Sequence, residues 1–202
     1  MKNYTHSEEL KNLLFRIDRC LECYEKFKNY GEENRIRIRE WYNEGPWFFP
    51  PSEDNRVKGF LGTGKVIFIC PRPSTRGKIP SQADLHFYEL MKKYGFEDAH
   101  ITDLVKCRGM AGEISKKVID NCFPFLQEEI IILKPKLMIA VGDQVHRALT
   151  KKSIRSEKIT HYAFRYIPRK KLKKKLEEDF RSVRKNIESR CEALSGSSPA
   201  YS

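Results

Sequence analysis

The sequence predicts an α/β fold built on a parallel sheet, and three observations carry this prediction. From residue 65 onward, short apolar runs alternate with segments of helical period. The run at 66–70, VIFIC, is wholly apolar and is closed by Pro71, which suits a strand buried on both faces. A length of 202 residues suffices for one domain with a substantial core. We therefore expect one domain over residues 1–190 and a disordered tail at 191–202.

Hydrophobic period and capping signals place the individual elements. The expected strands cover residues 66–70, 99–105, 137–141 and 159–164. The expected helices cover residues 7–28, 81–94, 115–133, 144–150 and 169–189. Residues 30–64 contain REWYNEGPWFFPPSEDNR, which is rich in aromatic residues, Pro and Gly and has no clear period, so we expect a loop or insertion there. Ligands of parallel sheets bind beyond the carboxyl ends of the strands, and a site is expected there.

The charge balance points to a polyanionic partner. The chain has 39 Lys and Arg against 27 Asp and Glu, a formal charge of +12, which favours nucleic acid first and an acidic membrane second. No stretch approaches the roughly 18 apolar residues of a membrane span, and MKNYTHSEEL does not have the pattern of a signal peptide. We expect a monomeric cytoplasmic protein, nucleoid-associated in a prokaryote, that binds DNA, with single-stranded DNA and RNA as alternatives.

Four of the six cysteines form a candidate metal site. Cys20 and Cys23 are two residues apart on the expected first helix, and Cys107 and Cys122 follow much later. Six cysteines are too few for a disulfide scaffold of this length, and grouped cysteines in a reducing compartment are typical of metal or redox sites. Four thiolates suit an iron–sulfur cluster and a structural zinc equally well, so spacing alone leaves both metals open.

Several motifs together resemble the iron–sulfur branch of the uracil-DNA glycosylase superfamily. They are CLEC, ITDLVKCRG, NCFPFL and LKPKLMIAVG, and the resemblance covers about residues 15–185. It implies a three-layer α/β/α fold with a central four-stranded parallel sheet. It also implies that the four cysteines named above hold a [4Fe–4S] cluster, with zinc as the alternative.

The resemblance assigns roles to two side chains and fails to assign a third. His161, in ITHYAFRY, matches the family histidine that stabilises charge on the departing base. Asp103 stands where the family has an asparagine that reads the base. The first loop, CPRPSTRGKIP, has no carboxylate or amide where the family positions its attacking water, and the base-stacking aromatic falls near Ile79. Residues 47–49 (WFF), Phe87 and Tyr88 are the alternatives for stacking.

Asp103 changes the chemistry of base reading. An ionised carboxylate only accepts hydrogen bonds, whereas an amide both donates and accepts, so Asp103 matches the amide only when it is protonated. Two other roles stay open: it prefers a base edge that offers donors, or it positions the attacking water. A fourth reading is a strand-end ion pair with Arg72 or Lys106.

Basic and hydroxyl side chains surround the expected site and are candidates for binding phosphates. They are Arg72, Ser74, Thr75 and Arg76 in the first loop, and Arg165, Arg169 and Lys170 after His161. Such side chains at a pocket mouth bind phosphates on either side of a flipped nucleotide. The alternative is a solvated basic helix face.

The sequence thus predicts a DNA-repair glycosylase that hydrolyses the N-glycosidic bond of uracil or of another deaminated or damaged base. Because fold does not fix function, the main alternative is a catalytically inactive iron–sulfur protein that binds nucleic acid on the same scaffold. A third reading is hydrolysis or transfer on another substrate, such as RNA or a free nucleotide.

Overall fold

A four-stranded sheet with all strands parallel lies at the centre of the molecule, in the order β2-β1-β3-β4. The computed structural model describes residues 8–24, 29–41, 45–54, 56–73, 80–108, 113–164 and 166–195. The strands are β1 (Val66–Cys70), β2 (His100–Asp103), β3 (Leu137–Val141) and β4 (Glu157–Ile159). This arrangement confirms the predicted fold class.

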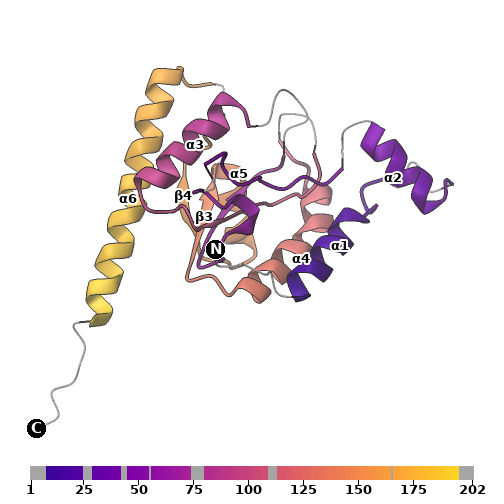
Figure 1. Ribbon diagram of the computed structural model, residues 1–202, viewed down its shortest axis with the longest axis horizontal. Coiled ribbons are helices and arrows are strands. Elements are labelled where there is room, and N and C mark those ends of the chain that lie inside the picture. Colours follow the sequence, from indigo (N-terminus) through magenta and orange to yellow (C-terminus); the bar gives the residue numbers. More distant parts are fainter. Residues whose placement is uncertain are drawn as a thin grey trace, which may run out of the picture.

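Helices cover both faces of the sheet and make three layers (Figure 1). They are α3 (Gln82–Lys93), α4 (Lys116–Leu133), α5 (Asp143–Lys151) and α6 (Arg169–Ser195). Phe68 of β1 packs on one face with side chains of α3 and α6. Ile67 and Ile69 pack on the other face with side chains of α4 and α5. Alternate residues of one strand are therefore buried on opposite faces, which explains the continuous apolar run.

Two further helices precede the sheet. α1 (Glu8–Asp18) packs through Leu10, Leu13 and Ile17 against the outer side of α4 (Figure 1). The predicted helix at 7–28 is too long, because the chain leaves the helix before Cys20. The prediction of a loop over 30–64 is also wrong in part, since α2 (Glu32–Trp41) and the short helix η2 (Gly59–Leu61) lie within it. In the described residues, no helix is long and apolar enough to cross a membrane.

The last strand is shorter than expected. The predicted strand at 159–164 is wrong, because β4 ends at Ile159. The backbone N–H of Thr160 donates to Asp179 of α6 (2.7 Å), so the chain turns away from the sheet before His161. α6 continues to Ser195, six residues beyond the predicted end, and residues 196–202 lie outside the described ranges.

Candidate active site and cysteine cluster

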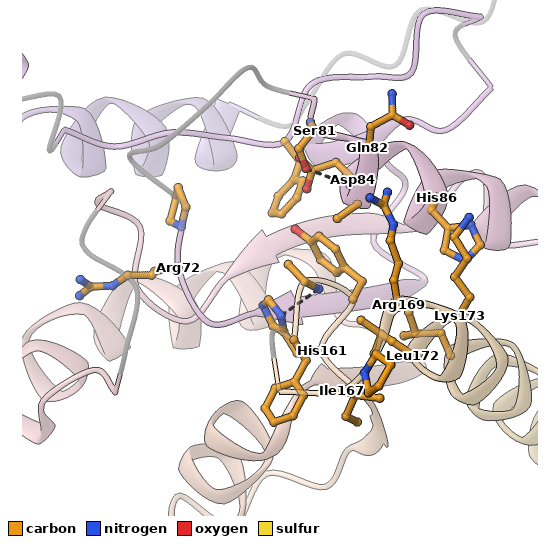
Figure 2. A pocket seen from close by; sticks show the side chains of 18 of the residues that line it. Arg72, Ser81, Gln82, Asp84, His86, His161, Ile167, Arg169, Leu172 and Lys173 are labelled. Carbon is orange, nitrogen blue, oxygen red and sulfur yellow. Dashed lines mark hydrogen bonds between the residues drawn. The ribbon is translucent and has the colours of Figure 1, made fainter.

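A cavity of about 730 Å³ opens beyond the carboxyl ends of the strands (Figure 2). The segment after β1, the start of α3, the segment between β4 and α6, and the start of α6 all contribute to its lining. In an open parallel sheet this is the edge where ligands bind, at the point where strand order reverses. The order β2-β1-β3-β4 places that reversal between β1 and β3.

His161 lines the cavity and is held in one tautomer. Its Nδ1 accepts a hydrogen bond from the backbone N–H of Ala163 (3.2 Å), so a neutral His161 carries its proton on Nε2. Burial lowers the pKa of His161 to about 4, although the nearby carboxylate of Asp84 opposes the shift. The ring stacks on Tyr162 with centroids 5.0 Å apart. His161 is therefore a neutral hydrogen-bond donor at physiological pH.

A glycine at the end of β3 makes room for this histidine. Gly142 has φ of +95°, a conformation that side-chain-bearing residues rarely adopt, and a Cβ at this position would lie 3.2 Å from Cβ of His161. The VG pair that ends the third strand thus permits the close approach of the segment after the fourth.

Aromatic side chains from the insertion form part of the cavity wall. Trp47 and Phe49 line it and meet edge to face with ring centroids 5.1 Å apart. The backbone of Trp47 is tied to the segment after β2, where its N–H donates to the carbonyl of Lys106 (3.2 Å). Phe87 and Tyr88 are buried in the core below, so they are not available to stack on a ligand. Ile79 lies outside the described residues.

Asp103 does not belong to the described lining of the cavity, although it is within electrostatic reach of residues that do. Its side chain is buried, and Oδ1 has no hydrogen-bond partner among the described residues. Burial raises the pKa of Asp103 well above its usual range, and the positive charges of Lys106 and Arg72 offset this only in part. A neutral carboxyl group both donates and accepts hydrogen bonds, as the amide of asparagine does.

The predicted ion-pair partners of Asp103 are not paired with it in the described structure. Lys106 instead extends to Glu129 of α4, with which it forms a buried ion pair, and it donates to Thr102 as well. His100 of β2 contacts the other carboxylate oxygen of Glu129 (Nε2 to Oε1, 2.6 Å). Lys106 and His100 hold the pKa of Glu129 at about 2 against the opposing effect of burial.

The basic residues divide into a group at the cavity and a self-paired group. Arg72 lines the cavity, and in Figure 2 its side chain points away from Asp84 and His161. Arg169 and Lys173 of α6 also line it, and Lys170 is exposed beside them. No carboxylate of the described chain pairs with these three α6 residues.

Further along α6, basic side chains pair with acidic ones four residues away. The pairs are Lys174 with Glu178, Lys175 with Asp179, Arg181 with Glu177, and Arg184 with Glu188. The start of α6 therefore keeps its positive charge available at the cavity, whereas the later turns neutralise theirs. The predicted site residues Ser74, Thr75, Arg76 and Arg165 lie outside the described residues.

Asp84 is a cavity residue that the sequence analysis did not single out. It is the third residue of α3 and forms a capping box with Ser81, whose N–H and Oγ both donate to Oδ2 of Asp84 (2.7 Å each; Figure 2). The S-x-x-D pattern at the start of a predicted helix signals this arrangement. That pattern places the carboxylate at a helix start but does not show that it faces a cavity.

The four predicted metal-binding cysteines lie in one neighbourhood. Burial, together with the charges of Cys122, Cys20 and Cys23, raises the pKa of Cys107 to about 12. Burial likewise raises the pKa of Cys122 to about 11. In the described part of the chain, no three potential ligand side chains lie together in the geometry of a metal site. The thiols are thus near one another without a ligating arrangement, and a bound cation would offset the repulsion between their anionic forms.

Backbone and side-chain hydrogen bonds organise this neighbourhood. The N–H of Lys106 donates to Sγ of Cys122 (3.1 Å). Arg39 of α2 is fully buried and donates to the carbonyl oxygens of Cys20 (2.8 Å) and Asp18 (2.6 Å). Arg39 therefore ties α2 to the turn that carries the first two cysteines.

Comparison with known families agrees with the fold and the position of the cavity. The sequence model described as "Uracil DNA glycosylase superfamily" matches residues 60–201, which include every strand of the sheet and all the described cavity residues except Trp47 and Phe49. A search of curated proteins finds no match. With the parallel sheet, the cavity at its carboxyl edge and the family match over most of its length, the chain belongs to the uracil DNA glycosylase superfamily.

Proposed function

We propose that this protein is a DNA glycosylase that hydrolyses the N-glycosidic bond of uracil or of another deaminated or damaged base. Proteins of this superfamily act on DNA, most of them as glycosylases. The observation that carries the proposal is the neutral His161, fixed with its proton on Nε2, in a cavity of about 730 Å³ at the ligand-binding edge of the sheet.

His161 supplies the electrostatic part of the reaction. Negative charge develops on the base as the glycosidic bond lengthens, and a preorganised N–H donor stabilises that charge. Because His161 is neutral already, it donates a hydrogen bond without first taking up a proton. The half-buried ring of Trp47, packed edge to face on the buried Phe49, offers a surface on which an extruded base can stack.

The start of α6 binds the DNA backbone. Arg169, Lys170 and Lys173 are not neutralised by carboxylates of the described chain, and two of them line the cavity. Phosphate contacts of this kind position a nucleic acid without reading its sequence. Arg72 contributes from the other side, with Ser74, Thr75, Arg76 and Arg165 as further candidates from the sequence.

Asp103 is outside the described cavity lining, so it reaches a base only if the base enters beyond that lining. It is within electrostatic reach of three residues that line the cavity, Arg72, Asp84 and Tyr162. A protonated Asp103 has one donor group and one acceptor group, as does the asparagine that it replaces. It could therefore form the same pair of hydrogen bonds to the edge of a uracil base that comes within reach.

Cys20, Cys23, Cys107 and Cys122 are proposed to hold a [4Fe–4S] cluster, with zinc as the alternative. Their proximity and the N–H donated to Cys122 support the proposal. A bound cluster would connect the segment after α1 to the segment after β2. Anaerobically purified protein with the broad visible absorption of thiolate-bound iron, and equal amounts of iron and sulfide, is expected; a colourless preparation that contains zinc would contradict the cluster.

The glycosylase activity is tested with oligonucleotides that carry uracil, hypoxanthine or xanthine, followed by alkaline cleavage of abasic sites. We expect strand scission on at least one substrate, in single- or double-stranded form. One observation favours the inactive binding protein instead: residues 70–80, CPRPSTRGKIP, contain no carboxylate to position water. Salt-sensitive DNA binding without scission on any substrate would establish that alternative.

A further inference from the structure

The cavity contains a single carboxylate in its described lining, that of Asp84. The other charged or titratable side chains there are Arg72, Arg169, Lys173, His86, His161 and Tyr162. Hydrolysis of a glycosidic bond builds positive charge on the sugar and needs a water held against its anomeric carbon, and a carboxylate serves both requirements. The first loop supplies none by sequence, so Asp84 is the candidate that the cavity offers.

The position of Asp84 is fixed, and its accepting capacity is not used up. Ser81 directs two donors to Oδ2. A carboxylate accepts about four hydrogen bonds. Acceptor capacity is therefore available to a water molecule, on a side chain whose rotamer is already held by Ser81.

Asp84 and His161 line the same cavity but come from different elements. Asp84 comes from the start of α3 and His161 from the segment after β4, and both side chains line the cavity shown in Figure 2. The charge of Asp84 acts to raise the pKa of His161, against the larger effect of burial, so the two groups are within electrostatic reach of one another. A nucleotide between them would have a donor at its base and a carboxylate at its sugar.

We propose that Asp84 is the catalytic carboxylate that orients the attacking water and stabilises the positive charge on the sugar, replacing the group absent from the first loop. This inference rests on the glycosylase function proposed above. In the reaction, the bond between C1′ and the base nitrogen breaks and its electron pair leaves on the base. The water oxygen bonds to C1′, its proton passes through Asp84 to solvent, and the base anion takes up a proton from solvent.

The test compares Asp84→Asn with Glu89→Gln under single-turnover conditions, on the substrate that the oligonucleotide panel identifies. Asn keeps an oxygen that can accept from Ser81 but has no negative charge. Glu89 lies on the same helix, its side chain is 73% exposed, and it is not part of the described cavity lining, so its variant removes the same charge elsewhere. We expect Asp84→Asn to lower the rate constant by roughly 10²-fold or more, as for other charge-stabilising groups, and Glu89→Gln to leave it within about twofold.

Two further readouts separate chemistry from folding and binding. Asp84→Asn should melt within a few degrees of wild type and bind DNA containing a non-hydrolysable abasic site with wild-type affinity. An unchanged rate constant, or a loss of binding that accounts for the whole defect, would overturn the assignment of Asp84 while leaving the glycosylase function standing. If the wild type itself is inactive on every substrate, the proposed function fails before Asp84 is tested.

Discussion

Two carboxylates beside the same strand are equally buried, yet their pKa values are shifted in opposite directions. Asp103, at the end of β2, is 2% exposed, and Glu129, which packs against β2 from α4, is 0% exposed. Burial raises the pKa of Asp103, whereas Lys106 and His100 overcome burial and hold that of Glu129 at about 2. Partners, and not depth, decide the charge of a buried acid.

The difference separates a structural region from a functional one. The network around Glu129 joins β2 to α4 and leaves neither carboxylate oxygen without a partner. Oδ1 of Asp103 and Nε of Arg72 are buried without partners among the described residues, as is Nδ1 of His100 at the edge of the Glu129 network. Buried groups without partners cost stability, and what distinguishes Asp103 is that an oxygen of its carboxylate itself lacks a partner in the described part of the chain.

Loss of the paired carboxylate should have the largest effect. Glu129→Gln leaves Lys106 buried without its counter-charge, and we expect the free energy of unfolding to fall by about 3–5 kcal/mol. Glu128→Gln is the matched control, because Glu128 is an exposed neighbour that pairs with Arg16, and it should cost at most about 1 kcal/mol. Urea unfolding of both variants measures the difference. Similar losses of unfolding free energy in the two variants would show that the buried network stabilises the protein no more than the exposed ion pair does.

His161 should make the protein acid-sensitive. Its folded pKa of about 4 lies below the unfolded value of 6.5, so the unfolded state takes up a proton first, and stability is lost as pH falls from about 6.5 to about 4. The loss is up to about 3 kcal/mol at roughly 1.4 kcal/mol per pKa unit. We expect His161→Gln to flatten the dependence of unfolding free energy on pH in this range. Identical slopes in variant and wild type would refute a buried, neutral His161.

Arg39 extends the comparison to a buried positive charge that donates to two carbonyl oxygens, while its Nε has no partner among the described residues. Removal of its two hydrogen bonds in Arg39→Gln should cost about 2 kcal/mol or more. Arg37→Gln, on the exposed side of the same helix, is the control and should be close to neutral. If the cysteines bind metal, the Arg39 variant should also retain less iron or zinc after gel filtration; equal metal content in the two variants would show that Arg39 does not position the cysteine turn.

The smallest expected effect is that of Asp103→Asn, which should raise the stability of the protein at high pH. A raised folded pKa means that stability is fully present below the unfolded value of 3.8 and declines as pH rises through the folded pKa. Asp103→Asn does not ionise, so its melting temperature should exceed that of wild type by a few degrees at pH 8, and the difference should vanish near pH 4. A variant that is less stable than wild type at pH 8 would indicate an ionised, paired Asp103.

Local sequence pattern predicted the elements that are fixed by local contacts. It was less successful where contacts with residues distant in sequence determine where an element ends or whether it forms. The runs at 66–70 and 137–141 are strands with the expected bounds, and Ser81 caps its helix as expected. The end of β4 was wrong because Asp179 captures the N–H of Thr160. α2 was not predicted, since EENRIRIREW has no apolar face, and its Arg39 anchors it to another segment.

The candidate site shows the same limit. The resemblance pointed to His161, which lines the cavity, and to the four cysteines, because each stands in a recognisable motif. It gave no sign of Asp84, which faces a cavity only after α3 has packed on the sheet. The charges at the strand end suggested Lys106 as a partner of Asp103, three residues away, whereas Lys106 pairs with Glu129 across 23 residues of sequence.

The comparison of the two acids is tested most directly by NMR titration of their side-chain carboxyl carbons in protein labelled at Asp and Glu. Asp103→Asn and Glu129→Gln assign the two signals. We expect the Asp103 carboxyl to remain protonated far above pH 3.8 and the Glu129 carboxyl to remain ionised down to about pH 2. An Asp103 signal that titrates near 3.8, or a Glu129 signal that titrates near 4.5, would contradict the claim that partners set the charge of these buried groups.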